Sequence, residues 1–423
     1  MNFQPRFDSG KPLDGDLLPV APRPEPELVK KPDPGKARGL IARLSLIGFI
    51  TALASRATDP IIPPIAHDIQ VDPNAVALLT TAFALPFALV QPVLGPVGDM
   101  VGKVRLMIAC LAVTMLAMLA SGFAQDFTVL MVARIVAGAA AGGIFPVGIA
   151  VIGDLVPVKE RQVAIGRWLT AVITGNLRGS SLAGVVGDLV GWRGVFFVIT
   201  GLGVIALGVA IVTLRKAARG KPVQLSLSGF SRGYGSVFAN PRAKVCFSAV
   251  FIEAVFIHGL FPYVAILLIA SGETRASMAG IVIAAFGLGG VVYSLSVPIL
   301  VANIKQRLLM IIGGSLAAAT LVLIAFNFPW YVQAGVFTLF GFGFYLLHGS
   351  IQVHVTELSS TARGVAASLH SCFFYLGQAT GPVVYGFGFE QVGETPSLLV
   401  GAAFILFVGF ACAKLLRHRT GTV

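Results

Sequence analysis

Long apolar runs separated by short polar breaks fill the chain between residues 41 and 415. A bilayer core is about 30 Å thick and needs roughly 20 apolar residues per helix. Runs of this kind occur at 41–64, 75–98, 104–123, 127–152, 163–188, 194–214, 244–270, 277–302, 307–327, 330–354, 364–388 and 395–415. Backbone groups in lipid must bond within the protein, and no long strand-type alternation is present, so we expect helices. The pattern predicts an all-α membrane protein with twelve transmembrane helices.

The composition agrees with this prediction. Hydrophobic residues make up 56% of the 423 residues and charged residues only 12%, whereas a soluble domain has about 25% charged residues. Residues 1–39 differ, because they are polar, charged and rich in proline. Such a segment cannot bury enough apolar surface to fold and does not resemble a secretory signal. We therefore expect a disordered tail there.

The longest polar interruption divides the apolar runs into two groups of six. The expected units are a tail (1–39), an N-terminal six-helix bundle (40–214), a linker (215–243), a C-terminal six-helix bundle (244–415) and a second tail (416–423). The two halves resemble each other in sequence. When the second half is aligned with the first at one constant offset, four glycines coincide: Gly175, Gly179, Gly184 and Gly191 align with Gly377, Gly381, Gly386 and Gly393. Many secondary transporters are built from such repeats, with the substrate between the halves. The sequence thus predicts two pseudo-symmetric bundles packed through small residues.

The net charge of +12 gives the orientation rather than a nucleic-acid partner. Most lysines and arginines lie in the two tails, the linker and the loops on one side of the predicted helices. By the positive-inside rule this side, with both termini, is cytoplasmic. We expect a multi-pass protein of the cell inner membrane.

Neither a metal site nor a cofactor is expected. The four cysteines have no CxxC partner, and no phosphate-binding GxxxxGK[ST] motif is present. Without a nucleophile–base set, the sequence does not predict an enzyme.

Several short motifs resemble those of the major facilitator superfamily. The loop GPVGDMVGKVR resembles the family's signature between helices two and three, and the matching residues are Gly95, Asp99, Gly102, Lys103 and Arg105. RIVAGAAAGGIFP, from Arg134, and GDLVPVKER, ending at Arg161, also resemble the family's fourth helix and the following loop. GNLRGSSLAG resembles the glycine-rich motif of antiporters, with Ser180 in place of a proline. Within the family the pattern is most similar to twelve-helix bacterial drug–proton antiporters.

This resemblance implies a carrier that works by alternating access. It implies that the loop from Gly95 to Arg105 holds the bundles together in one conformation and releases them in another. Arg161 and Arg363 occupy matching loops and are expected to do similar work. The alternative is that these basic residues only anchor the loops at the membrane surface.

Four charged residues are expected in one layer of the N-terminal bundle. Arg56 and Asp59 lie roughly 20–24 Å into the first predicted helix, and Arg134 and Arg178 reach a similar depth. A charge at such a depth costs at least about 2.5 kcal/mol, so it should face a partner or a water-filled cavity. Asp59 is either the proton-coupling group, with Arg134 beside it, or part of a static ion pair, or solvated at the interface. The three prolines that follow should end or kink the helix.

Glu253, near the midplane of helix seven, is a second candidate for proton coupling. Further polar residues are expected to line a substrate cavity: Arg56, Arg178, His258, Tyr345, His348, Gln352 and Gln378. Hydrogen bonds between helices are the alternative for the histidines. Because the intramembrane charges, counted with Arg178, sum to a positive value, an anionic or zwitterionic substrate is favoured.

The sequence leads to one main hypothesis and two alternatives. The main hypothesis is a monomeric, proton-coupled carrier in the lipid bilayer that exports a small organic compound. A proton-coupled symporter for metabolite uptake is the first alternative. A membrane sensor that transports nothing is the second, and the intramembrane charges in both halves argue against it.

Overall fold

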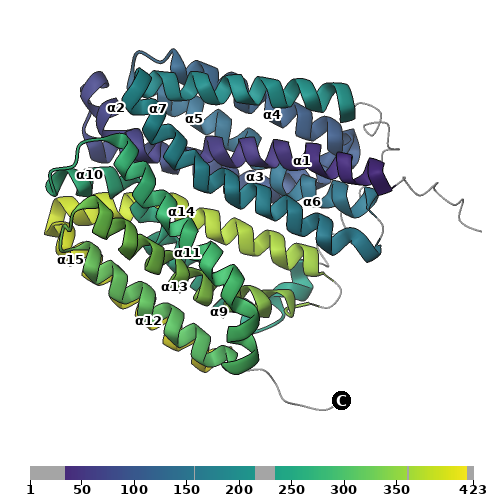
Figure 1. The fold of residues 1–423 in the computed structure, drawn as a ribbon. Coiled ribbons are helices and arrows are strands. Elements are labelled where there is room, and N and C mark those ends of the chain that lie inside the picture. The colour runs from purple at the N-terminus through teal and green to yellow at the C-terminus, as the bar shows by residue number, and fades with distance from the viewer. Residues whose placement is uncertain (1–33, 157, 215–233, 360–361, 417–423) are drawn as a thin grey trace, which may run out of the picture.

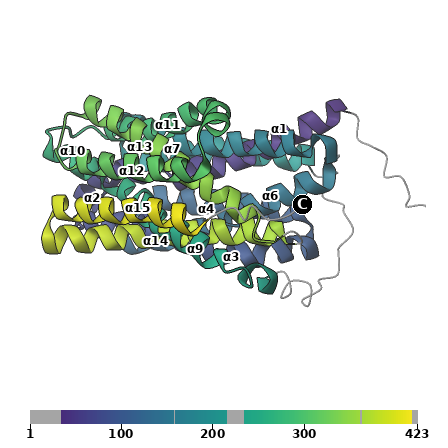
Figure 2. The ribbon, with the colours of Figure 1, turned by 90° about the horizontal axis from the view of Figure 1, so that it is seen from below.

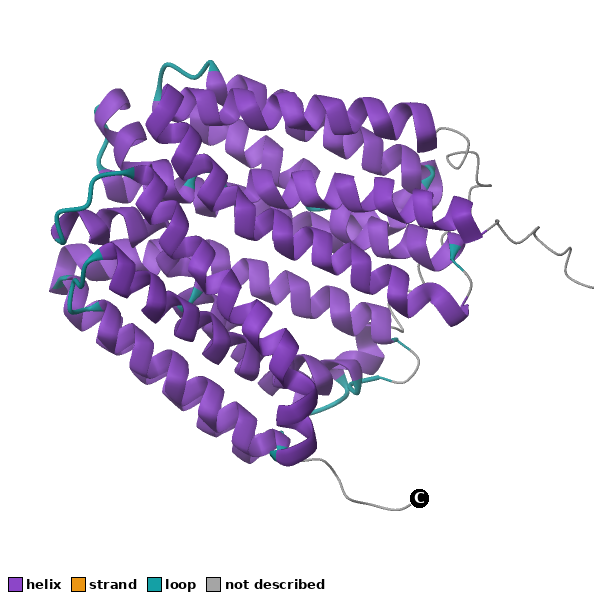
Figure 3. Ribbon diagram, in the orientation of Figure 1, coloured by secondary structure: helices purple, strands orange, loops and turns teal. Residues whose placement is uncertain are grey.

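The computed structural model describes residues 34–156, 158–214, 234–359 and 362–416, and this part of the chain is almost entirely helical (Figures 1 and 3). The elements are α1 (Pro34–Ser55), η1 (Asp59–Ile61), α2 (Ile62–Ile69), α3 (Pro73–Val101), α4 (Lys103–Gly122), α5 (Phe127–Ala141), α6 (Ile144–Leu155), α7 (Val158–Leu214), α9 (Arg242–Phe256), η3 (His258–Tyr263), α10 (Val264–Ala270), α11 (Ala276–Asn303), α12 (Gln306–Ile324), α13 (Trp330–Thr356), α14 (Arg363–Val392) and α15 (Glu394–Leu415). Within the described residues there is no strand, which confirms the all-α prediction.

Twelve membrane crossings follow from these helices. Ten helical segments of the described chain are long and apolar enough to span a bilayer. One of them, Val163–Leu214, contains two crossings, because Gly191 breaks it at a φ of 76°. After this turn α7 runs back along α4, since Phe197 lies against Gly122 and Met115 against Gly203. The twelfth crossing is α14, which has 30 residues but a more polar composition.

The first and seventh crossings are broken at equivalent points. α1 ends at Ser55 and continues through η1 into α2, while α9 ends at Phe256 and continues through η3 into α10. Proline lies in both breaks, at Pro60 and Pro262, and proline cannot donate the backbone hydrogen bond that a helix needs. The first helix is interrupted, as expected, but the break begins directly after Ser55, before the prolines, and Pro63 and Pro64 lie in α2 rather than at the end of a helix.

The two bundles repeat the same packing. A Cβ on Gly175 would lie 2.3 Å from the carbonyl oxygen of Phe49, and one on Gly377 would lie 2.3 Å from that of Phe251. Only glycine allows helices to approach so closely. The turns after the fifth and eleventh crossings also match, with positive φ at Gly191 and Gly393. These correspondences establish the pseudo-symmetry of the halves.

The bundles meet along two helix pairs, α7 with α11 and α3 with α14 (Figures 1 and 2). A Cβ on Gly184 of α7 would lie 2.3 Å from the Ala276 carbonyl of α11. We call the end of the molecule that carries the α2–α3 and α10–α11 connections the closed end. We call the opposite end, with the α3–α4 and α11–α12 connections, the basic end.

Several hydrogen bonds join the bundles in the half next to the closed end. The Thr81 hydroxyl donates to the Ala379 carbonyl at 2.7 Å, and the Asn74 amide donates to the Glu390 carboxylate at 3.2 Å. Asp188, at the end of the fifth crossing, accepts from the backbone N–H groups of Ala276 and Ser277, at 2.9 Å each. Asp188 therefore caps the first turn of α11 from the other bundle.

Some predicted boundaries shift. Residues 34–39 were expected in the tail but already belong to α1, because the helix extends past the apolar run. The rest of that tail, residues 215–233 of the linker and residues 417–423 lie outside the described residues. Residues 234–238 of the expected linker are helical.

Candidate functional site

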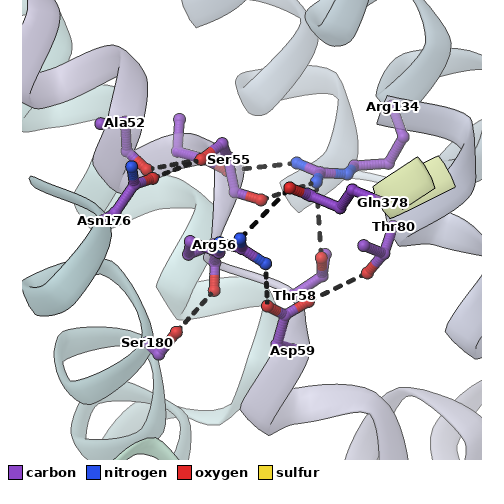
Figure 4. A network of polar contacts seen from close by, with 11 residues as sticks. Ala52, Ser55, Arg56, Thr58, Asp59, Thr80, Arg134, Asn176, Ser180 and Gln378 are labelled. Carbon is purple, nitrogen blue, oxygen red and sulfur yellow. Dashed lines mark hydrogen bonds and ion pairs between the residues drawn. The ribbon is translucent and has the colours of Figure 1, made fainter. Parts of the chain in front are cut away.

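The break between α1 and η1 places Arg56 and Asp59 inside the protein. Arg56 is 7% exposed and Asp59 is 0% exposed. Asp59 Oδ2 accepts from Arg56 Nη1 at 3.4 Å, and its Oδ1 accepts from the Thr80 hydroxyl of α3 at 2.9 Å (Figure 4). Both carboxylate oxygens thus have a donor, which a buried charge requires.

Arg56 also reaches the other bundle. Its Nη2 donates to Gln378 Oε1 of α14 at 3.2 Å, as Figure 4 shows. The guanidinium lies over the Phe261 ring of η3, with 4.9 Å between its carbon and the ring centroid. One side chain therefore contacts the buried carboxylate of its own bundle and two residues of the other bundle.

Arg134 of α5 supports the broken helix. It is fully buried and donates to the carbonyls of Ala54 and Ser55, at 3.3 and 3.4 Å, and to the Thr58 hydroxyl at 3.4 Å. The last carbonyls of a helix have no partner within it, so a cation at this position is favourable. Arg134 also lies over the Phe83 ring, 4.4 Å from its centroid. It contacts the peptide groups around Asp59 rather than the carboxylate itself.

The C-terminal bundle holds a second buried carboxylate. Glu253 of α9 is 0% exposed, and its Oε1 is hydrogen-bonded to His348 Nδ1 of α13. His348 in turn packs against His370 of α14, with ring centroids 4.9 Å apart. Glu253 Oε2 and His370 Nε2 have no hydrogen-bond partner among the described atoms. This cluster has the composition of a proton-exchanging site but contains no permanent cation.

Aromatic rings connect the two charged regions. His258 of η3 packs against Phe344 and Phe374, both at 4.8 Å between ring centroids. The same two rings contact His348, at 4.8 and 5.5 Å. His258 thus lies between the Arg56 region and the Glu253 cluster, and Tyr345 packs next to it against Phe344.

Two expected cavity residues do not join these groups. The side chain of Arg178 is exposed and shares a face of α7 with Val185 and Leu189, which are 43% and 76% exposed. Asn176, two residues earlier, faces α1 instead and accepts from the Ser55 hydroxyl at 3.0 Å. Arg178 is therefore not brought to Asp59. Gln352 is exposed at the end of α13.

The predicted switch loop lies at the basic end. Gly102 has a φ of 96° between α3 and α4, and Lys103 pairs with Asp154 at 2.5 Å. Arg161 donates to the Gly153 carbonyl at 2.6 Å, while Arg105 and Arg363 are exposed. Gly95 and Asp99 lie in α3, where the structure describes only their backbone. For this loop a switching role remains a prediction.

Three contributors to the site were not predicted from the sequence, namely Thr80, Asn176 and Asp188. Thr80 and Asn176 carry no charge, and Asp188 lies at the end of a predicted helix, so the sequence does not mark any of them as a site residue. Their roles arise from the contacts between helices. Within the described residues no group of three potential metal ligands is found.

Comparison with known proteins agrees with this architecture. The family model described as Major Facilitator Superfamily matches residues 44–382. The MFS-type transporter YfhI of Bacillus subtilis is 24% identical over 380 residues, covering 88% of this chain and 92% of the relative. The quinolone resistance protein NorA of Staphylococcus aureus is 25% identical over 356 residues, covering 82% and 89%.

A solved structure has the same fold. It is a bacterial homologue of the human lysosomal transporter Spinster, in an inward-facing and unoccupied conformation. The TM-score is 0.72 at 17% identity, over 90% of this chain and 98% of the other. With a family match over most of its length and this fold, the chain belongs to the major facilitator superfamily of membrane transporters.

Proposed function

We propose that the protein is a proton-driven exporter of a small organic compound, in which Asp59 binds the coupling proton. The observation that supports this most is the double contact of Arg56, which bonds Asp59 in its own bundle and Gln378 in the other. In this proposal the basic end faces the cytoplasm, and the contacts at the closed end hold the bundles together on the opposite side. The carrier works as a monomer.

Coupling requires that proton binding differs in free energy between the two conformations. When Asp59 takes up a proton, Arg56 loses the negative charge that holds its guanidinium next to Gln378. At 3.4 Å, with an effective dielectric constant of 20, this attraction is about 5 kcal/mol before the cost of desolvation. Opening the closed end separates Arg56 from Gln378, so the protonation state of Asp59 and the conformation depend on each other. The Glu253–His348 pair is a second candidate for the same role.

Export is preferred over uptake because of the relatives. NorA is named a quinolone resistance protein, and another relative, from Bacillus subtilis, is named multidrug resistance protein 2. Proton-coupled uptake of a metabolite is the alternative. The charge argument for an anionic substrate loses its basis, since Arg178 lies away from the site.

The test measures retention of fluorescent drug-like compounds in cells that lack their major exporters. Wild type is compared with Asp59→Asn, each with and without a protonophore. Asp126→Asn is the matched control, because Asp126 is an exposed N-cap at the same end of the molecule and asparagine also caps helices. We expect wild type and Asp126→Asn to expel at least one compound, and Asp59→Asn and the protonophore to abolish this export.

The outcomes separate the hypotheses. Export by Asp59→Asn at normal expression would refute the coupling role of Asp59 and direct attention to Glu253. Accumulation that the protonophore abolishes would favour the uptake symporter. To fix the direction without cells, proteoliposomes with an imposed pH gradient should show substrate movement opposite to proton movement.

A further inference from the structure

Arg178 is an exposed cation in the part of α7 that crosses the membrane. Arg167, also exposed, lies about three turns earlier on the same face of the helix, and Val185, which is 43% exposed, lies about two turns later. Other residues of α7 make the contacts with its neighbours, namely Gly175 and Gly179 with α1, and Leu177 and Gly184 with α11. The face that carries Arg178 is therefore turned toward lipid.

The position of Arg178 along the helix is near the middle of the bilayer. At about 1.5 Å per residue, it lies roughly 22 Å from Val163, where the apolar span begins, and roughly 20 Å from Gly191, where the helix turns back. The hydrocarbon core is about 30 Å thick, so neither interface is close to its Cα. A charged side chain at this depth is costly unless it is paired or reaches toward an interface.

The protein itself does not supply the partner. The hydroxyls of Thr170, Thr174 and Ser181, on the same side of α7, each donate to a carbonyl three or four residues earlier, at 2.9, 2.7 and 3.3 Å. These polar groups are satisfied within their own helix. A guanidinium has five N–H donors and no acceptor, and the Arg178 side chain forms no hydrogen bond or ion pair with any of the described residues. Its acceptor has to come from the surroundings of the chain.

The direction of the side chain selects one leaflet. Side chains of an α-helix lean toward its N-terminus. α7 begins at the basic end, since Arg161 near its start donates to the Gly153 carbonyl, next to the Lys103–Asp154 pair of the α3–α4 connection. The Arg178 guanidinium therefore extends toward the leaflet at the basic end. The anionic group that this leaflet offers is a lipid phosphate, whose geometry suits a guanidinium.

We propose that Arg178 binds the phosphate of an anionic phospholipid, drawn inward from the leaflet at the basic end along the exposed face of α7. A lipid with a net charge of −1 neutralises the guanidinium, whereas a choline headgroup brings its own cation with it. The lipid lies beside the contact between the bundles (Figure 1), because a Cβ on Gly287 of α11 would lie 2.0 Å from Leu177, the residue before Arg178. This inference does not depend on the proposed carrier function.

The test measures lipid bound to the purified full chain by native mass spectrometry. The protein is released from nanodiscs that contain equal amounts of phosphatidylglycerol and phosphatidylcholine with the same acyl chains. We expect wild type to retain phosphatidylglycerol in preference to phosphatidylcholine. In Arg178→Gln this preference should fall at least about tenfold, as expected for the loss of a charge-assisted hydrogen bond. Arg178→Lys keeps the charge but not the planar fork, so its preference should be intermediate.

Arg167→Gln is the matched control, because it removes the same charge from the same face of α7 nearer the basic end. It should keep the wild-type preference. Equal retention of the two lipids by wild type would overturn the proposal, and so would an equal loss in both variants, since this would show general attraction to surface charge. A wild-type dimer that Arg178→Gln dissociates would also overturn it, because the partner would then be an acidic group of a second copy.

Thermal unfolding provides a second measurement. In nanodiscs of phosphatidylcholine alone, Arg178→Gln should unfold at the wild-type temperature or above, because an exposed, unpaired charge is removed. Adding phosphatidylglycerol should raise the unfolding temperature of wild type and of Arg167→Gln, as a ligand that binds the folded state does. It should leave that of Arg178→Gln unchanged. An equal rise in all three proteins would contradict a site at Arg178.

Discussion

Asp188 allows a direct test of how the closed end is held. It lies on α7 of the N-terminal bundle, and its carboxylate accepts from two backbone N–H groups at the start of α11 in the C-terminal bundle. These bonds exist only while the two helix ends meet. Replacing Asp188 with alanine should therefore destabilise the closed end without changing the interior of either bundle.

The size of the effect follows from the two bonds. One hydrogen bond contributes about 0.5–1.5 kcal/mol net, and Asp188 is exposed, which places each bond at the lower end. Together they should stabilise the closed end by about 1–2 kcal/mol, which corresponds to a roughly five- to thirtyfold change in the ratio of the two conformations. Asp188→Asn keeps an acceptor but loses the charge, so its effect should be intermediate.

The assay is a distance measurement between spin labels at His67 in α2 and Thr274 before α11, both exposed at the closed end. The labelled cysteines are introduced after the four buried native cysteines are replaced by alanine. Asp188→Ala should move population to a longer distance. Asp126→Ala is the matched control, because Asp126 caps α5 at 2.9 Å within its own bundle. An unchanged distribution in Asp188→Ala, or an equal change in both variants, would refute the reasoning.

Three further results are expected. Arg134→Gln should lower the free energy of unfolding in detergent by about 3 kcal/mol or more, because the carbonyls at the end of α1 lose a buried cationic donor. A loss below about 1 kcal/mol would contradict the role of Arg134 in supporting the broken helix. Glu253→Gln should cost less stability than Glu253→Ala, since glutamine retains a carbonyl oxygen that can accept from His348, and thermal unfolding of both variants tests the ranking. In the α10–α11 connection, the hydrogen bond from Arg275 lowers the pKa of Glu273 from its usual value of 4.5 to about 2. The contribution of Glu273 to stability is therefore fully present above pH 4.5 and is lost as the pH falls through about 2. Glu273→Gln should leave the pH dependence of transport unchanged between roughly pH 5 and 8. A changed profile in this range would contradict the low pKa of Glu273.

Buried charge was only partly predictable. The sequence indicates that Arg56 and Asp59 need partners, because an isolated charge in lipid is costly. It gives three cations at a similar depth but not their directions. In an α-helix, Asn176 and Arg178 lie about 200° apart around the axis, so when α7 packs on α1 through Gly175, only Asn176 reaches the α1 side. The rotation of α7 thus removes Arg178 from the expected layer.

The sequence by itself determined the helical class, the twelve crossings, the interruption of the first helix and the relation between the halves. It did so because lipid requires continuous apolar helices, proline interrupts them, and repeated glycines mark repeated close contacts. Only the tertiary structure decided that Arg56 bonds to Gln378 and that Asp188 caps a helix of the other bundle. These contacts join residues far apart in the chain, and they depend on how each helix is rotated and on which end of the bundles is closed. The local pattern of residues does not encode either of these quantities.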